Sequence, residues 1–533
     1  MDLLPSAHVD TFCRDHLPPA DQWPELVFEL PELHYPDRLN CATALLDDVI
    51  ARHGADRPCL HAPGATTWTY ADLLAAANRV ARALVEDLGI VPGNRVLLRG
   101  PNNPWLTACW FGVLKAGAVA VTTMPLLRPG ELATIHEIAR LDLALVDERF
   151  LDGTEGLAGA DVRVVGYGGA EGLAALMAGK PATYDDVATS SDDVALLAFT
   201  SGTTGRPKAT MHFHRDVLAI CDTFSRHVLR PSPDDVFTGT PPYAFTFGLG
   251  GVLLFPLHAG ASTVLVERAT PAELAGIIDD FGVTTCFTAP TAYKAMLVAG
   301  ATLPSLKAAV SAGEHLPAAV WQAFLDATGV RIIDGIGATE MLHIFVSAAG
   351  DDIVPGSTGR AVPGYTATVL DPHGREAAPG EPGRLAVKGP TGCRYLDDPR
   401  QRVYVQDGWN VTGDTFTRDA EGYFFYQARS DDMIVSSGYN IAAPEVEEAL
   451  LKHPEVAECA VIGVPDEARG SLVKAFVVLA AGVAGDEQKV DELQAFVKAE
   501  IAPYKYPRAI AFVDALPRTA TGKLQRFRLR TGG

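Results

Sequence analysis

The sequence has few cysteines, no long apolar run and a deficit of basic residues. Its 533 residues include eight cysteines, which are scattered, and none lies in a Cys-x-x-Cys pair. This pattern argues against a disulfide framework or a structural zinc site and favours reduced thiols in a cytoplasmic protein. No stretch of about 18 uncharged apolar residues occurs, so no membrane-spanning helix is expected. The N-terminus has no basic segment followed by an apolar core, which argues against a signal peptide.

Acidic side chains outnumber basic ones by 65 to 44, which gives a formal net charge of −21. A nucleic-acid surface needs a basic patch to face the phosphates, so we expect no nucleic-acid partner. An anionic small molecule is still compatible with this balance. Backbone N–H groups and one or two cations are enough to bind a phosphate.

The chain is too long for one ordinary hydrophobic core, so we expect at least two domains. Short apolar runs alternate with helical patterns, which predicts an α/β fold. We expect a large N-terminal domain of layered mixed sheets and helices over residues 1–428, and a small α+β domain over residues 429–533. The predicted elements are a helix that begins at a capping box, Thr69–Asp72, strands at 94–98 and 194–199, and a helix through 217–228, followed in the small domain by a helix from Pro444, strands at 459–464, 475–479 and 509–513, and a helix through 490–501.

A Gly/Thr-rich loop follows the predicted strand at 194–199 and carries the strongest local signal for chemistry. It reads Thr-Ser-Gly-Thr-Thr-Gly-Arg-Pro-Lys over residues 200–208. The glycines let the backbone approach an anion closely, the hydroxyls donate hydrogen bonds, and Lys208 supplies a point charge suited to phosphate. The loop is not a Walker A motif, because Pro207 stands where the second glycine is required. We therefore expect a phosphate loop formed by Thr200, Ser201, Gly202, Thr203, Thr204, Gly205 and Lys208.

This string resembles the phosphate loop of the adenylate-forming superfamily, which comprises acyl-CoA synthetases, adenylation domains of peptide synthetases, and luciferases. Four further motifs of that family follow in order, at residues 334–340 (DGIGATE), 408–414 (GWNVTGD), 428–432 (ARSDD) and 516–523 (LPRTATGK). The resemblance implies an enzyme that uses ATP to activate a carboxylic acid as an acyl-adenylate. It then passes the acyl group to the thiol of coenzyme A.

The resemblance also implies roles for individual residues. Glu340 is carried over as the Mg²⁺ ligand, in keeping with the preference of magnesium for carboxylate oxygen. Thr339 matches the residue that bonds the α-phosphate. Lys523 matches the lysine that bridges the carboxylate and the α-phosphate, and together with Lys208 it neutralises charge as pyrophosphate leaves. The other implied nucleotide-binding residues are Ser311, Gly313, Glu314, Asp334, Gly335, Asp414 and Arg429.

A two-stage mechanism follows from the same resemblance. Asp431 matches the pivot about which the small C-terminal domain rotates, so that domain is expected to be mobile. One orientation brings Lys523 to the adenylate. The other opens a pantetheine tunnel lined by Gly438 and Tyr439. A few residues that absorb a large backbone change are enough for such a hinge.

Three segments favour an aromatic acid. The strings at 311–317 (SAGEHLP), 339–345 (TEMLHIF) and 242–250 (PYAFTFGLG) resemble the benzoate-CoA and 2-aminobenzoate-CoA ligase branch of the family. Aromatic and small side chains suit the face of a flat ring. We expect a ring of benzoate size that carries an ortho or para amino or hydroxyl group. The predicted pocket residues are Tyr243, Phe245, Ala289, Pro290, Gly337 and His343.

Three alternatives remain open at this point. The enzyme could transfer its acyl group to the phosphopantetheine of a free carrier protein instead of coenzyme A. A luciferase-type oxidation uses the same motifs. A scaffold protein with a decayed nucleotide site is disfavoured, because the charged residues of all the motifs are intact.

Overall fold

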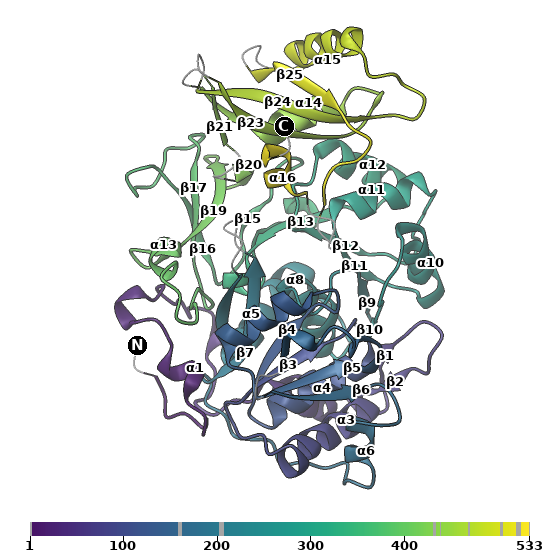
Figure 1. The fold of residues 1–533 in the computed structure, drawn as a ribbon, viewed down its shortest axis with the longest axis vertical. Helices are drawn as coiled ribbons and strands as arrows, with labels where there is room; N and C mark the ends of the chain where they lie inside the picture. The colour runs from purple at the N-terminus through teal and green to yellow at the C-terminus, as the bar shows by residue number, and fades with distance from the viewer. Residues whose placement is uncertain are drawn as a thin grey trace. The chain divides into compact units, whose positions relative to one another are not determined.

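The protein is described here by a computed structural model that covers residues 3–157, 162–201, 207–429, 433–436, 439–466, 470–501, 505–518 and 524–531. The chain forms two compact units (Figure 1): Met1–Ala367 with Val387–Val411, and Thr368–Ala386 with Thr412–Gly533. The predicted fold class, a large α/β unit and a smaller C-terminal one, is confirmed. The predicted boundary between residues 428 and 429 stays a prediction, because compactness divides the chain by packing and does not locate a hinge.

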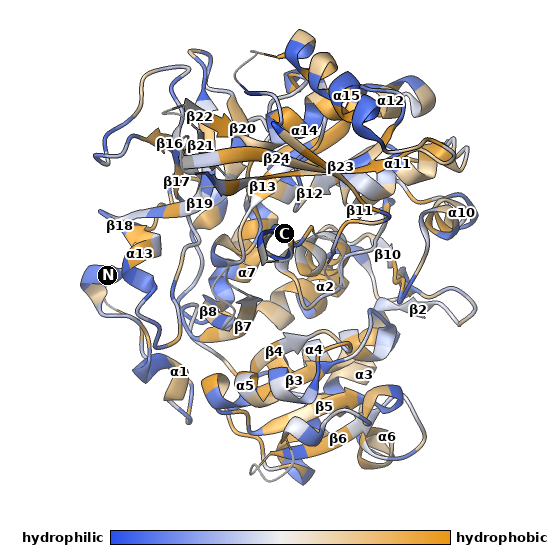
Figure 2. Ribbon diagram, turned by 45° about the horizontal axis from the view of Figure 1, so that its top comes forward, coloured by the Kyte–Doolittle hydropathy of each residue, from blue (hydrophilic) through white to orange (hydrophobic). Residues whose placement is uncertain are grey.

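The first sheet of the large unit has the strand order β6-β5-β3-β4-β7-β8 and is parallel except for the β7–β8 hairpin. Strands β3, β4 and β5 are buried at every position, as parallel strands covered on both faces are. Figure 2 shows β5 in the apolar colour. The strands are β3 (Arg95–Arg99), β4 (Val119–Thr123), β5 (Leu143–Asp147), β6 (Arg163–Tyr167), β7 (Val194–Ser201) and β8 (Pro207–Phe213).

The second sheet of the large unit has the order β15-β14-β13-β12-β11-β9-β10-β1-β2. Its central strands, from β13 to β1, are parallel, so the carboxyl ends of β11, β12 and β13 meet at one edge. This edge is the usual place for a ligand in an α/β sheet. The strands are β1 (Pro58–His61), β2 (Trp68–Thr69), β9 (Val236–Gly239), β10 (Ser262–Val264), β11 (Thr285–Thr288), β12 (Ala308–Ala312), β13 (Ile332–Gly337), β14 (Ile344–Ser347) and β15 (Arg360–Ala361).

Several helices of the large unit begin at capping residues. Thr69 and Asp72 form the predicted capping box at the start of α3, and Thr270 with Glu273 does the same for α10. The helices are α1 (Phe12–Asp15), α2 (Asp48–His53), α3 (Tyr70–Arg82), α4 (Pro104–Lys115), α5 (Pro129–Ala139), α6 (Leu173–Met177), α7 (His214–Ile220), α8 (Thr246–Gly248), α9 (Phe255–His258), α10 (Pro271–Phe281), α11 (Pro290–Val298), α12 (Ala318–Thr328) and α13 (Gln401–Tyr404).

The smaller unit is built around a sheet of order β23-β24-β25, on which α14 and α15 pack through a common apolar core. Pro444 lies in the first turn of α14, as predicted. A separate hairpin pairs β21 with β22. The elements are β21 (Met433–Ser436), β22 (Tyr439–Ala442), α14 (Ala443–Leu451), β23 (Val456–Asp466), β24 (Gly470–Leu479), α15 (Glu487–Glu500), β25 (Ala509–Phe512) and α16 (Arg526–Thr531).

The remaining sheet has the order β16-β17-β19-β18, with β20 paired to β19. The chain crosses from one unit to the other within strands of this sheet. Its strands are β16 (Thr366–Leu370), β17 (Gly383–Lys388), β18 (Val405–Gln406), β19 (Trp409–Arg418) and β20 (Phe424–Arg429).

The predicted elements are present, but strand β8 was not foreseen. Its polar residues Thr210 and His212 are as deeply buried as its apolar ones. No alternation of inner and outer residues therefore marks this strand in the sequence. All eight cysteines are buried and unpaired. No helix among the described residues is long and apolar enough to span a membrane.

Close packing of α3 on α4 generates a stability prediction. A Cβ added at Gly112 in α4 would lie 2.5 Å from Val80 Cγ1 and 3.0 Å from the Ala77 carbonyl oxygen, whereas one added at Gly276 in α10 would meet nothing within 4 Å. We expect Gly112→Ala to destabilise the large unit by about 1–2 kcal/mol through overpacking. Gly276→Ala should stabilise it by about 0.5–1 kcal/mol through helix propensity. Urea denaturation of the two variants checks this, and equal effects would contradict the packing argument.

Candidate active site

The predicted phosphate loop joins the two strands of a hairpin. Thr200 pairs with Lys208 and Ser201 pairs with Pro207 across β7 and β8, so the two ends of the loop lie side by side. Gly202, Thr203, Thr204 and Gly205 lie outside the described residues. The hairpin places Lys208 at the mouth of the loop, where a phosphate bound by the loop would meet it.

Lys208 and Glu340 form an ion pair although they lie far apart in the sequence. Lys208 Nζ is 3.1 Å from Glu340 Oε1, and both side chains are largely buried. Tyr395, which we did not predict, bonds both groups: its hydroxyl donates to Glu340 Oε1 and accepts from Lys208 Nζ. The aromatic ring of Tyr395 lies 4.2 Å from Lys208 Nζ, a cation–π distance.

A buried polar group fixes the backbone at Thr339. His212 Nε2 lies 2.8 Å from the Thr339 carbonyl oxygen, and Asp216 lies 3.8 Å from the other ring nitrogen of His212. Arg394 bonds the same carboxylate, and neither side chain of that pair is exposed. Burial opposes ionisation of Asp216, but the Arg394 charge and the His212 contact hold its pKa below the usual range. The turn at Thr339–Met341 is thereby anchored to β8.

Two predicted nucleotide residues meet at the carboxyl ends of β12 and β13. Ser311 pairs in register with Asp334, and among the described residues neither Ser311 Oγ nor Asp334 Oδ1 has a hydrogen-bond partner. Such buried polar atoms call for a ligand or an ordered water. Gly313 follows with φ of +87°, a conformation that favours glycine. Gly335 is buried in β13, and Glu314 is half-buried.

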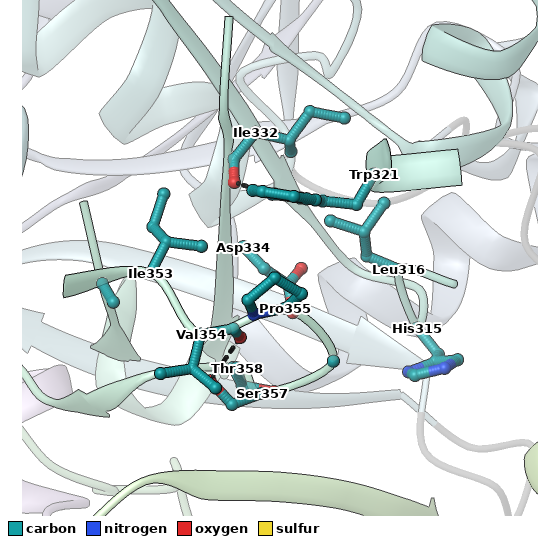
Figure 3. Close-up of a pocket in the computed structure, with 12 residues that line it drawn as sticks. His315, Leu316, Trp321, Ile332, Asp334, Ile353, Val354, Pro355, Ser357 and Thr358 are labelled. Carbon is teal, nitrogen blue, oxygen red and sulfur yellow. Dashed lines mark hydrogen bonds between the residues drawn. The ribbon is translucent and has the colours of Figure 1, made fainter. Parts of the chain in front are cut away.

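Asp334 also borders a small cavity of about 20 Å³, lined by Trp321, Pro355 and Ser357 among others (Figure 3). This volume holds one water molecule at most, so the cavity is too small to bind a nucleotide base. Burial raises the pKa of Asp334 to about 7, against lowering contacts from the Gly335 backbone and Thr358.

The predicted pocket residue His343 lies inside a group of four phenylalanine rings, which we call the aromatic cage. The ring centres of Phe224, Phe247, Phe255 and Phe287 lie 5.3, 5.9, 4.6 and 6.4 Å from that of His343. Burial lowers the pKa of His343 to about 3, partly offset by the Phe247 backbone. Neither ring nitrogen makes a geometrically complete hydrogen bond to a described residue. The cage therefore contains a neutral imidazole whose one polar contact among the described residues is a loose one to the Phe247 backbone.

The backbone allows this arrangement at three places. Leu342 has φ of +69°, a rare conformation for a leucine, and it turns the chain between Glu340 and His343. A Cβ at Gly250 would lie 2.4 Å from His343 Cδ2, so only glycine leaves room for the imidazole there. A Cβ at Gly337 would lie 2.7 Å from the His343 carbonyl oxygen.

The other predicted pocket residues fall in different environments. Tyr243 is buried, and its hydroxyl lies 3.3 Å from Thr107 Oγ1 on α4, so it is already used in packing. Phe245 is 38% exposed. Ala289 caps α11 and Pro290 opens it, both at the carboxyl end of β11.

In the smaller unit, the predicted ribose residues are neighbours. Asp414 and Arg429 pair in register across β19 and β20. Tyr439 begins β22, opposite Ser436. Lys523, Asp431 and Gly438 lie outside the described residues.

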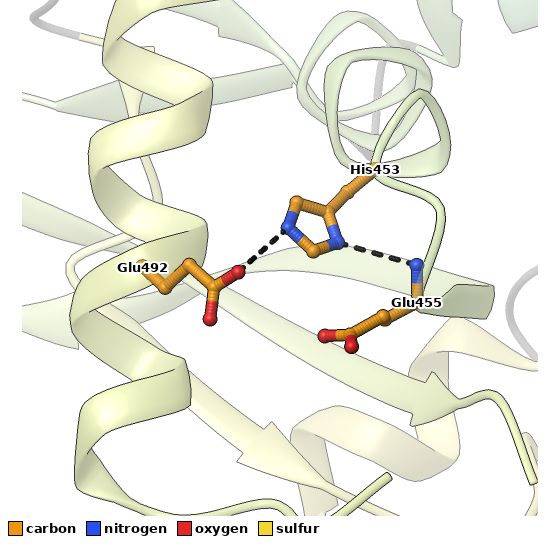
Figure 4. A group of neighbouring side chains, drawn as sticks. All are labelled: His453, Glu455 and Glu492. Carbon is orange, nitrogen blue, oxygen red and sulfur yellow. Dashed lines mark hydrogen bonds and ion pairs between the residues drawn. The ribbon is translucent and has the colours of Figure 1, made fainter.

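A histidine and two glutamates in the smaller unit have metal-ligand spacing (Figure 4). His453 Nε2 lies 3.2 Å from Glu492 Oε1, and the ligand atoms of His453, Glu455 and Glu492 lie within 4.8 Å of one another. Lys489 Nζ donates to both glutamates. Their charge is therefore met by a lysine, and nothing in the group calls for a metal ion.

Comparison with known proteins agrees with this geometry. A family model described as AMP-binding enzyme matches residues 46–394, and its C-terminal domain model matches residues 445–523. The benzoate–CoA ligase of Thauera aromatica is 36% identical over 518 residues, covering 94% of this chain and 97% of that protein. The 3-hydroxybenzoate–CoA ligase of Aromatoleum sp. (strain CIB) is 33% identical, covering 92% and 96%. The crystal structure of the anthranilate CoA ligase AuaEII with anthranoyl-AMP is 35% identical, with a TM-score of 0.89 and coverage of 94% and 99%.

The chain therefore belongs to the family of AMP-binding enzymes. It is an AMP-forming acid–thiol ligase, as the motifs predicted, and ATP, Mg²⁺ and coenzyme A are the co-substrates and cofactor of this family. The residues present fit a magnesium nucleotide: a lysine and a carboxylate meet at the phosphate loop, and unpartnered buried polar atoms lie at the adjoining sheet edge.

The raised pKa of Asp334 generates a prediction for stability against pH. An unfolded aspartate ionises near 3.8 and the folded one near 7, so between these values the unfolded state loses its proton first and stability falls as pH rises. We expect Asp334→Asn to stabilise the apo protein by about 2–3 kcal/mol more at pH 8 than at pH 4.5. Thermal or urea unfolding at both pH values measures this difference.

The exposed Asp280 in α10 provides the control. The difference between the two pH values should be larger for Asp334→Asn than for Asp280→Asn. An Asp334→Asn effect that is independent of pH would contradict a buried, protonated carboxyl.

Proposed function

We propose that this enzyme activates a benzoate-type acid with ATP and transfers the aroyl group to coenzyme A. We further propose that an amino or hydroxyl group on the ring is read by His343. The observation that carries the choice of acid is the aromatic cage: a neutral, buried imidazole without a geometrically complete hydrogen bond to a described residue, among four phenylalanine rings. A flat apolar ring with one polar substituent matches the chemistry of these side chains, which are aromatic apart from one imidazole.

The nucleotide half of the proposal rests on side chains that the fold brings together. Lys208 supplies positive charge beside the phosphate loop, and Glu340 supplies a carboxylate oxygen for Mg²⁺. The magnesium ion, when bound, neutralises charge on the phosphates. Thr339 is proposed to bond the α-phosphate, and its backbone is held by His212. These groups favour attack of the acid carboxylate on the α-phosphorus by lowering the repulsion between two anions.

The C-terminal half of the proposal rests on the motifs. Asp414 and Arg429, neighbours across two strands, are proposed to bind the ribose. Lys523 is proposed to bridge the acid and the α-phosphate, with Asp431 as the hinge and with Gly438 and Tyr439 lining the path of the pantetheine thiol.

The ring substituent is the least determined part of the substrate. The three relatives are nearly equally similar, at 36, 33 and 35% identity, yet their names give benzoate, 3-hydroxybenzoate and anthranilate. Overall similarity therefore does not select among these acids. A site that hydrogen-bonds a substituent rejects the analogue that lacks it, so the partner of His343 decides the preference. We propose 2-aminobenzoate and benzoate as the first acids to test.

Mass spectrometry of one reaction tests the function directly. Enzyme, Mg-ATP and coenzyme A are incubated with a mixture of benzoate, aminobenzoates, hydroxybenzoates, cinnamate and medium-chain fatty acids. A dominant aryl-CoA is the expected product. Acyl-AMP without any thioester would favour the carrier-protein alternative, and a fatty acyl-CoA would overturn the aromatic assignment.

Replacement of His343 tests its role in substrate choice. His343→Leu keeps an apolar filling but removes both ring nitrogens, so kcat/KM for the preferred amino- or hydroxybenzoate should fall by about 10–100-fold. Benzoate should change by less than about threefold, since it has no ring substituent to bond.

Phe224→Leu is the matched control, because it removes a cage ring without a polar atom. It should lower kcat/KM for all ring acids to a similar extent. If His343→Leu does the same, the imidazole has only a packing role.

Replacement of Lys523 separates the two half-reactions. Lys523→Ala should slow adenylation by roughly 100-fold or more, because one charge that stabilises the transition state is lost. Thioester formation from a synthetic aroyl-AMP should stay within about threefold, because that step no longer involves the α-phosphate displacement. Lys452→Ala, which breaks an exposed ion pair with Glu500, is the control and should affect neither step. Equal loss in both steps for Lys523→Ala would contradict this assignment.

A further inference from the structure

The hydroxyl of Tyr395 lies between the two charged groups that the proposed function assigns to the phosphates and the metal ion. Lys208 Nζ donates to Tyr395 Oη, which in turn donates to Glu340 Oε1. Lys208 Nζ also lies 3.1 Å from that same carboxylate oxygen. One phenol thus links the cation and the anion of the site.

The direction of this chain of hydrogen bonds is determined. A tyrosine phenol is neutral near pH 7 and carries its proton on the hydroxyl oxygen. An ammonium group can only donate, and a neutral phenol has a single proton. The Tyr395 proton therefore goes to Glu340, as a charge-assisted hydrogen bond.

Tyr395 is rigidly mounted on the strand that carries Lys208. Residues 394–396 run antiparallel to β8, where Met211 N donates to Arg394 O at 2.8 Å and Leu396 N donates to Ala209 O at 2.9 Å. Tyr395 N donates to Gln401 Oε1 at 2.9 Å, and the residue is 1% exposed. The hydroxyl therefore has a fixed position relative to Lys208.

Both contacts of the Glu340 carboxylate end on the same oxygen. Tyr395 and Lys208 meet Oε1, and in the part of the chain that the structure describes no hydrogen bond reaches Oε2. Two donors on one oxygen fix the rotation of the carboxylate. They leave its second oxygen available to a cation.

We propose that Tyr395 is a positioning residue: its hydroxyl holds Glu340 Oε1 beside Lys208 and so directs Glu340 Oε2 to the divalent metal of bound ATP. This inference rests on the proposed function. Without the hydroxyl, the carboxylate can rotate and pair with Lys208 through either oxygen. The metal ion then has to compete with the Lys208 ammonium for both carboxylate oxygens. Mg²⁺ therefore increases the affinity for the nucleotide by less.

The test measures binding of a non-hydrolysable nucleotide, α,β-methylene-ATP, by calorimetry with Mg²⁺ and with EDTA. Tyr395→Phe keeps the ring that lies against Lys208 and removes only the hydroxyl. The gain in nucleotide affinity on adding Mg²⁺ should fall by about tenfold, the worth of a hydrogen bond to a charged group. Affinity in EDTA should change by less than about twofold.

Two further variants distinguish positioning from structure. The ring of Tyr404 lies 5.6 Å from Lys208 Nζ, so Tyr404→Phe removes another phenol hydroxyl from a ring near this lysine. This variant should leave the gain in nucleotide affinity on adding Mg²⁺ within about twofold of wild type. In a Glu340→Gln background, Tyr395→Phe should cause no additional loss, because the group that it positions is already altered.

The outcomes are separable. If wild type binds no nucleotide, both the proposed function and the role of Tyr395 are overturned. If wild type binds but Tyr395→Phe keeps the full magnesium gain, only the role of Tyr395 is overturned. An equal loss with and without Glu340 would show that Tyr395 acts through the fold and would also overturn it. Unfolding curves of each variant verify that the protein compared is folded.

Discussion

The ion pair between Arg394 and Asp216 is the interaction on which the nucleotide site depends. Both side chains are fully buried, so removal of either would leave an uncompensated charge in the interior. Asp216 lies in the first turn of α7, which follows β8 directly, and Arg394 precedes Tyr395. The pair therefore fixes Tyr395 beside Lys208, and the same carboxylate supports His212, which holds Thr339. Three segments distant in sequence converge on the phosphate loop through one carboxylate.

The contact of Tyr395 with Lys208 and Glu340 meets two requirements that adenylation places on these charges. Charges that will meet ATP must be close enough to act together, and they must not collapse irreversibly onto each other in the free enzyme. Lys208 and Glu340 are in contact, but a neutral phenol shares the contact with them. Part of the attraction is thus directed through a group that cannot change charge at neutral pH.

The sequence predicts a nucleotide site because its motifs are contiguous strings whose chemistry is local, and the structure brings two of the predicted residues, Lys208 and Glu340, into contact. Their roles stay a prediction. The capping box at Thr69, the helix at Pro444 and the two-unit α/β organisation were predictable for the same reason. Tyr395 was not, because it is 187 residues from Lys208 and no local pattern links them. The Arg394–Asp216 pair spans 178 residues and is equally invisible in one sequence.

The residues of the acid site stay a prediction. Residue types indicated an aromatic pocket, and His343 does lie among aromatic rings. The sequence alone does not show which predicted pocket residue has a polar atom that could hydrogen-bond a ring substituent, because this depends on the fold. The Tyr243 hydroxyl is near Thr107, and Phe245 is partly exposed, whereas neither ring nitrogen of the buried His343 makes a geometrically complete hydrogen bond to a described residue.

The path of the chain between the two units has a consequence for biosynthesis. The large unit is completed by Val387–Val411, after Thr368–Ala386 of the smaller unit has already been made. Strand β19 is translated before its partner β20, and β23 is translated before β24 and β25, with which it forms a sheet. Domains fold as they emerge from the ribosome. The large unit can therefore be complete before the last residues of the smaller unit have been translated. As a packed unit, the smaller one is therefore discontinuous in the sequence, because it contains the segment 368–386 as well as the residues that follow Val411.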